Sequence, residues 1–154
     1  MRRRAFVSSV FLLAMPGVAI AGAFEDFFVA IKFDDEYRLK SLLLRGMDPN
    51  TVNEQGFPAI TFGMMQESPR AVRVLLSSGK LNPDQADRRG ETPLMVACTL
   101  NKPEWVAALL AKGAQVGEDG QWTALHNAAA SGSSESIELL VKSGADFICV
   151  GFNG

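Results

Sequence analysis

The sequence has very few of the side chains on which catalytic and metal sites are usually built. It contains one histidine, His126, and two cysteines, Cys98 and Cys149, among 154 residues. A single histidine excludes the His-Glu-x-x-His arrangement of zinc hydrolases, and neither cysteine belongs to a Cys-x-x-Cys pair. The acidic stretches at 34–36 and 118–119 lack the alternating Asp-x-Asp spacing of a calcium loop. We therefore predict no enzyme activity, no metal site and no cofactor.

The chain also lacks an excess of basic residues. It carries 15 Lys and Arg against 17 Asp and Glu, and three of the basic residues are the arginines at positions 2–4. Removal of that N-terminal segment would leave a net charge of 12 − 17 = −5. Nucleic acid is therefore not an expected partner, because proteins that bind it carry basic surfaces that neutralise phosphates. A partner with a basic surface is weakly favoured.

The N-terminus has the layout of a secretory signal peptide. The arginines at 2–4 precede an apolar run at 5–20, and small residues follow at positions 19, 21 and 23. We predict a signal peptide over residues 1–23 that is cleaved after Ala21 or Ala23. The mature protein would then be periplasmic or secreted, with no membrane insertion. The alternative is a retained inner-membrane anchor, because residues 5–24 are just long enough to span a bilayer.

A motif in the middle of the chain predicts a turn followed by two helices. It reads Gly-Glu-Thr-Pro-Leu-Met-Val-Ala over residues 90–97 and closes with Leu-Leu-Ala-Lys-Gly-Ala over residues 109–114. Thr92 can cap a first helix that begins at Pro93, because proline at the first helical position forfeits no hydrogen bond. Gly113 can adopt the left-handed conformation that ends a second helix.

The spacing between Thr92 and Gly113 recurs three more times along the chain. The same 21-residue offset joins Glu25 to Gly46, Pro58 to Gly79, and Thr123 to Gly144. In this alignment the third position is always apolar and the sixth is always small. One repeat cannot bury both of its faces, so the copies must stack on one another. The aligned residues are Phe27, Ile60, Leu94 and Leu125 at the third position, and Ala30, Gly63, Ala97 and Ala128 at the sixth.

These motifs resemble the ankyrin repeat, a unit of about 33 residues with a β-turn and two helices. The signal-like N-terminus makes the chain similar to exported bacterial ankyrin-repeat proteins. The resemblance implies an all-α ankyrin-repeat solenoid of helix-turn-helix units with β-hairpin-like loops over residues 24–154. We predict repeats at about 24–56, 57–90, 91–121 and 122–154. The last repeat stops where a fifth would begin, which favours truncation or a partner that covers this end.

The repeat pattern gives structural roles to the remaining reactive or charged residues. His126 occupies the histidine of the Thr-Pro-Leu-His motif, which in ankyrin repeats forms hydrogen bonds between neighbouring turns. Cys98 falls where a small buried residue packs between repeats, and Cys149 falls in a late loop, so we expect no disulfide between them. The acidic residues Glu25 and Asp26 are expected to stabilise the exposed start of the first helix.

The resemblance also implies a function. Ankyrin solenoids hold partner proteins on a concave face made of the hairpin tips and the exposed side of the first helices. We therefore predict a non-enzymatic, monomeric protein-protein interaction module that binds another protein in an exported compartment. The alternatives are a periplasmic immunity or inhibitor protein for a toxin, and an accessory factor for oxidative-stress defence.

The candidate partner-binding residues come from three hairpin tips and the helices beside them. The tips are predicted at 48–55, 85–89 and 117–122, and Trp122 is the strongest single candidate for a partner contact. The full set is Phe62, Met65, Gln66, Arg88, Arg89, Val96, Thr99, Leu100, Trp122, Asn127 and Ser131.

Overall fold

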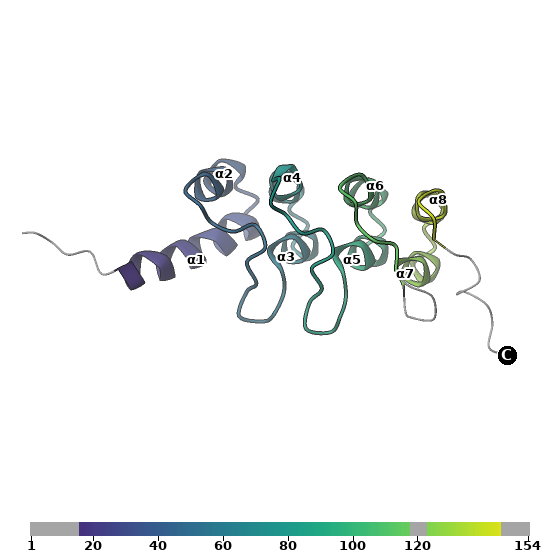
Figure 1. The fold of residues 1–154 in the computed structure, drawn as a ribbon, viewed down its shortest axis with the longest axis horizontal. Helices are drawn as coiled ribbons and strands as arrows, with labels where there is room; N and C mark the ends of the chain where they lie inside the picture. Colours follow the sequence, from purple (N-terminus) through teal and green to yellow (C-terminus); the bar gives the residue numbers. More distant parts are fainter. Residues whose placement is uncertain (1–15, 118–122, 146–154) are drawn as a thin grey trace, which may run out of the picture.

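The chain folds into a stack of helix pairs. The computed structural model describes residues 16–117 and 123–145, with side chains from Gly22 onward. Within these ranges α1, α3, α5 and α7 form one row and α2, α4, α6 and α8 form a second row beside it (Figure 1). This arrangement confirms the predicted all-α solenoid. The helices are α1 (Pro16–Lys32), α2 (Glu36–Leu44), α3 (Ala59–Met65), α4 (Pro69–Ser77), α5 (Pro93–Thr99), α6 (Pro103–Ala111), α7 (Ala124–Ser131) and α8 (Ser134–Lys142).

Helices α4, α5 and α6 begin at prolines, and the predicted cap of α5 and the predicted end of α6 are both present. Pro69, Pro93 and Pro103 are the first residues of α4, α5 and α6, where a missing N–H group costs no helical hydrogen bond. The Thr92 hydroxyl accepts a hydrogen bond of 3.3 Å from the Met95 N–H and so caps α5. Gly113, with φ of +91°, has the left-handed conformation that ends α6.

Small residues in the first helices allow the repeats to pack closely. The four residues at the third position are at most 2 % exposed, and those at the sixth are all buried. A Cβ atom added at Gly63 would lie 3.2 Å from a methyl carbon of Val72 and 3.3 Å from one of Ile31. These distances are tighter than most Cβ contacts, so an alanine at this position would require Val72 and Ile31 to shift by a few tenths of an ångström.

The loops between repeats are joined by hydrogen bonds that recur along the stack. Loops 45–58 and 78–92 both project beyond the row of first helices (Figure 1). The Asn50 side chain donates to the Lys80 carbonyl at 2.8 Å and accepts from the Asn82 N–H at 2.7 Å. One repeat further on, the Asp84 carboxylate accepts from the Gln115 N–H at 2.8 Å. The base of each loop is therefore held in place by hydrogen bonds to the base of the following loop.

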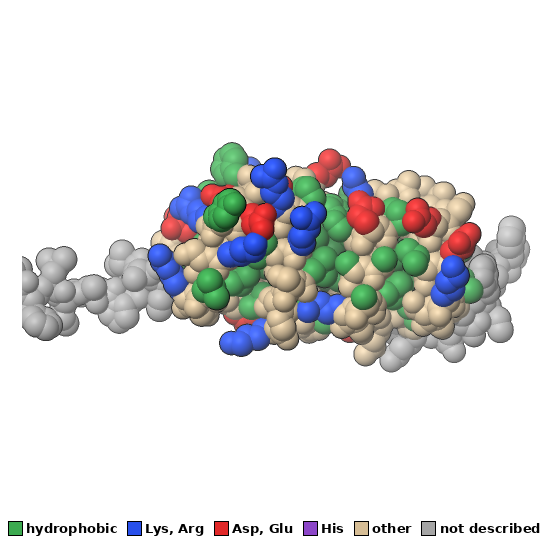
Figure 2. Space-filling view, turned by 90° about the horizontal axis from the view of Figure 1, so that it is seen from above, with side chains coloured by type: hydrophobic (Ala, Val, Ile, Leu, Met, Phe, Trp, Pro, Cys, Tyr) green, Lys and Arg blue, Asp and Glu red, His purple; other side chains and the backbone are tan. Residues whose placement is uncertain are grey.

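The second helices form an outer face with an uneven distribution of charge. Figure 2 looks down on this face and shows Lys and Arg side chains gathered over α2 and α4. Arg70 and Arg73 of α4 are exposed there, whereas α8 presents the exposed carboxylates of Glu135 and Glu138. No helix within residues 16–117 and 123–145 has the length and hydrophobicity needed to cross a membrane.

The expected role of Glu25 and Asp26 at a helix start is wrong. Helix α1 begins at Pro16, so both acids lie inside the helix. Asp26 instead forms an ion pair of 2.6 Å with Arg38 of α2. Helix α1 also runs through both predicted cleavage sites. The buried side chains described on it, Phe27, Ala30 and Ile31, all come after those sites.

One buried hydroxyl is unsatisfied, and its removal should stabilise the fold. Thr61 of α3 is 0 % exposed, and among the described residues its Oγ1 atom has no hydrogen-bond partner. Thr61→Val keeps the shape of the side chain, so we expect the free energy of unfolding to rise by about 1 kcal/mol. Urea denaturation measures this difference. Thr99→Val is the matched control on an exposed hydroxyl, with an expected change within about 0.5 kcal/mol. A clear loss of stability in Thr61→Val would contradict the assignment.

Candidate partner-binding face

The first helices and the projecting loops together form one side of the solenoid, which we call the binding face. It consists of the surface of α1, α3, α5 and α7 together with loops 45–58 and 78–92 (Figure 1). The third predicted tip, 117–122, lies outside the described residues apart from Gly117. Trp122 therefore remains a prediction.

Helix α3 brings three of the predicted residues together on this face. Met65 is 42 % exposed, Gln66 is exposed beside it, and Phe62 is half-buried. The Phe62 ring packs edge-to-face on Phe28 of α1, with 5.6 Å between the ring centroids. Methionine and aromatic side chains that remain accessible are typical of protein contact surfaces.

A pocket of about 450 Å³ adjoins these residues, between α1, loop 45–58 and α3. Phe24, Phe28 and Phe62 line it, and its edge carries Glu25 and Glu54. This pocket was not predicted from the sequence. The available signal was the spacing of Phe24 and Phe28, which places both rings on the same side of a helix.

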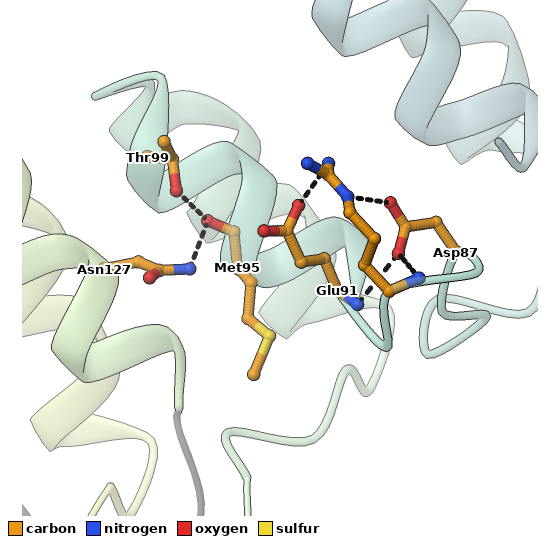
Figure 3. Close-up of polar contacts among 6 residues, drawn as sticks. Asp87, Glu91, Met95, Thr99 and Asn127 are labelled. Atoms are coloured by element: carbon orange, nitrogen blue, oxygen red, sulfur yellow. Dashed lines mark hydrogen bonds and ion pairs between the residues drawn. The ribbon is translucent and has the colours of Figure 1, made fainter.

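The two predicted arginines of the second tip hold neighbouring loops together. Arg88 donates to the Glu54 carbonyl across the gap between the loops, at 3.3 Å. Arg89 forms ion pairs with Asp87 at 3.3 Å and with Glu91 at 2.7 Å, two acids labelled in Figure 3. Its guanidinium also lies 5.8 Å from the centre of the Phe57 ring. Both arginines are exposed, yet their contacts fix the shape of the loops.

The predicted exposure of Val96 is wrong. Val96 is only 7 % exposed, because α5 is enclosed between α3 and α7 and packs closely against both. Leu100, the residue that follows α5, is half-buried and packs against the core. Thr99 is exposed, and its hydroxyl donates to the Met95 carbonyl at 3.0 Å (Figure 3). Of these three residues, Thr99 alone is fully available to a partner.

The two predicted residues of α7 join that helix to α5. Asn127 donates from Nδ2 to the Met95 carbonyl at 3.2 Å (Figure 3), and the Ser131 hydroxyl donates to the Cys98 carbonyl at 2.8 Å. Both side chains are half-buried. The α5–α7 end of the binding face is therefore held by contacts between repeats, and the accessible apolar side chains lie nearer α1 and α3.

His126 and Cys98 both have structural roles in the repeats. The Nδ1 atom of His126 accepts from the Thr123 N–H at 3.2 Å and completes the capping box of α7. Burial raises the pKa of the Cys98 thiol to about 12, so the thiol stays protonated at neutral pH. Cys98 is a free thiol, and Cys149 lies outside the described residues. Within the described ranges no three His, Cys, Asp or Glu side chains converge on a possible metal position.

The fold and the face define a protein built of stacked two-helix repeats. A family model described as "Ankyrin repeats (3 copies)" matches residues 27–119 and, in a second, overlapping match, residues 64–149. The chain belongs to the ankyrin-repeat family, whose repeats are a general protein-protein interaction module and are generally not catalytic.

The curated relatives that the chain matches are much longer. Over 110 residues, or 70 % of its length, the chain is 30 % identical to the human Transient receptor potential cation channel subfamily A member 1. It is 37 % identical over 67 residues, or 42 % of this chain, to the mouse Ankyrin repeat domain-containing protein 13B. It is 33 % identical over 102 residues, or 64 %, to Glycerophosphocholine phosphodiesterase gde1 of Schizosaccharomyces pombe. The chain spans 10, 11 and 9 % of these three proteins, about a tenth of each.

The second tip should depend on one buried carboxylate. Asp87, whose side chain is 1 % exposed, accepts from the N–H groups of Arg89 at 2.8 Å and Glu91 at 3.0 Å. Asp87→Ala leaves both donors without this partner, so we expect a loss of about 1–3 kcal/mol in the free energy of unfolding. Asp87→Asn keeps an oxygen acceptor and should lose less. Chemical denaturation of the two variants checks this, and an unchanged midpoint for Asp87→Ala would contradict the proposed role.

Proposed function

We propose that the chain binds a partner protein on the binding face, in an exported compartment, and does no chemistry of its own. The observation that carries the proposal is the accessible apolar surface of α3, where Met65 is 42 % exposed and Phe62 adjoins the rings of α1. Binding energy in protein interfaces is concentrated in a few such side chains at the centre of the contact.

The fixed loops support this proposal. Arg88 and Arg89 connect loop 78–92 to loop 45–58, and Asn50 joins the bases of the two loops. A surface held in place before binding loses less conformational entropy when the partner arrives. Loops that projected freely would offer the same side chains at a larger entropic cost.

Truncation of Met65 should weaken binding while leaving the fold intact. The partner is first captured by the full chain from an extract of the source cells, and its affinity is then measured by titration. We expect Met65→Ala to raise the dissociation constant about tenfold, the effect of losing about 1.4 kcal/mol at a central contact. Helical circular dichroism should not change.

The matched control for Met65→Ala is an exposed apolar residue of the outer face. Leu44 of α2 is 88 % exposed and lies in the other row of helices. Leu44→Ala should leave the dissociation constant within about twofold, because scattered surface apolar residues are not contact sites by themselves. A larger loss for Leu44→Ala than for Met65→Ala would place the partner on the outer face and contradict the proposal.

The exported location rests on the N-terminal sequence. The basic, apolar and small-residue segments at 2–23 have the order of a cleavable signal. Removal of residues 1–21 or 1–23 would leave Phe27, Ala30 and Ile31 in the core. In a Gram-negative host we expect a periplasmic product that begins at Gly22 or Phe24, as measured by intact mass. A membrane-bound product that retains Met1 would support the anchor instead.

A further inference from the structure

We propose that the pocket between α1 and the first loop receives an apolar side chain of the partner, flanked in the partner's sequence by Lys or Arg. This inference rests on the proposed function, because it assigns one contact within the binding face. It names both the site on this chain and the chemistry of the segment that fits it.

The apolar wall of the pocket is built on the core and is therefore rigid. Phe28 packs edge-to-face against Phe24 at 5.1 Å, Phe27 at 5.4 Å and Phe62 at 5.6 Å between ring centroids. Phe27 is 0 % exposed, so Phe28 is anchored from below, while Phe24 and Phe62 keep part of their surface accessible. Edge-to-face contacts fix the orientation of aromatic rings.

The pocket is large enough to receive an apolar side chain, with a volume of about 450 Å³. Val29, one helical turn after Glu25 in α1, is 39 % exposed and also lines the pocket. A leucine or phenylalanine that entered would remove apolar surface from water on both partners.

Two exposed carboxylates lie at the pocket. Glu25 and Glu54 are both exposed at its edge, and in the part of the chain with described side chains no ion pair within 4.0 Å involves either of them. Arg88 reaches Glu54 but bonds its backbone carbonyl. Two unpaired carboxylates beside an apolar opening favour a basic segment and repel an acidic one.

The outer face would not compete for the same segment. A larger hollow of about 930 Å³ lies between the ends of α2 and α4. It is lined by Lys40, which pairs with Glu36, and by Asp48 and Lys80. Lys and Arg side chains gather over these helices (Figure 2), so a basic segment is less favoured there than beside Glu25 and Glu54. The distribution of charge therefore directs a basic, apolar segment to the aromatic pocket.

The test uses the full chain and a displayed library of random nine-residue peptides. We expect the enriched peptides to share one apolar residue flanked by Lys or Arg. Val29→Lys places a cation in the mouth, one helical turn from Glu25, and should weaken those peptides about tenfold by repulsion and obstruction. Glu25→Gln combined with Glu54→Gln should weaken them about three- to tenfold and reduce their sensitivity to salt.

The matched control removes the same charge elsewhere. Glu135→Gln combined with Glu138→Gln changes two exposed carboxylates of α8 and should leave peptide binding unchanged. Equal weakening by this pair would mean that overall charge, not the pocket, attracts the peptides. Acidic consensus sequences, no enrichment, or full binding to Val29→Lys would each overturn the inference.

Further outcomes separate this inference from the proposed function and from other occupants. Partner binding that is lost in Met65→Ala but kept in Val29→Lys preserves the proposed function and overturns the pocket assignment. If neither Met65→Ala nor Val29→Lys weakens partner binding, both the proposed function and the pocket assignment are overturned. Two results would assign the pocket to this chain itself and overturn the inference. One is competition by a peptide of residues 1–15, and the other is a dimer in sedimentation that Val29→Lys dissociates.

Discussion

Close contact between successive first helices is the constraint on which the rest of the structure depends. Gly63 leaves no room for even one added carbon without displacing Val72 or Ile31. Its equivalents Ala97 and Ala128 are also fully buried. If this spacing widened, the Asn50 side chain could no longer bond both Lys80 and Asn82 in the next loop. Helix packing therefore determines where the loops lie, and the loops form half of the binding face.

The same constraint explains why the two ends of the binding face differ. Between α5 and α7, contact is so close that Val96 is buried and Asn127 and Ser131 are joined to neighbouring carbonyls. Between α1 and α3, bulky rings meet instead, and an open pocket remains beside loop 45–58. One architecture thus produces a closed end and an accessible end, and the exposed apolar side chains are concentrated at the accessible one.

The core was predictable because it follows a local rule. The fixed offset placed Phe27, Ile60 and Leu94 at one position, and each of them is buried. Prolines fixed the starts of helices for an equally local reason, since their effect on the backbone does not depend on neighbours. Thr92 and Gly113 were predictable in the same way.

The binding face was predictable only in part, because exposure depends on residues far away in the sequence. Val96 was expected at the surface, but the packing of α7 against α5 buries it. The aromatic pocket requires Phe28 and Phe62, which come from different repeats, to meet beside a loop. Helical periodicity gives the side of a helix on which a residue lies, and it does not give the distance between two such sides.

Hydrogen–deuterium exchange of the full chain, with and without its captured partner, tests most directly where the partner binds. The account predicts slower exchange on binding in residues 22–29, in loop 45–58 and in α3, with α2 and α8 unchanged. Slower exchange confined to the outer helices α2, α4, α6 and α8 would contradict it.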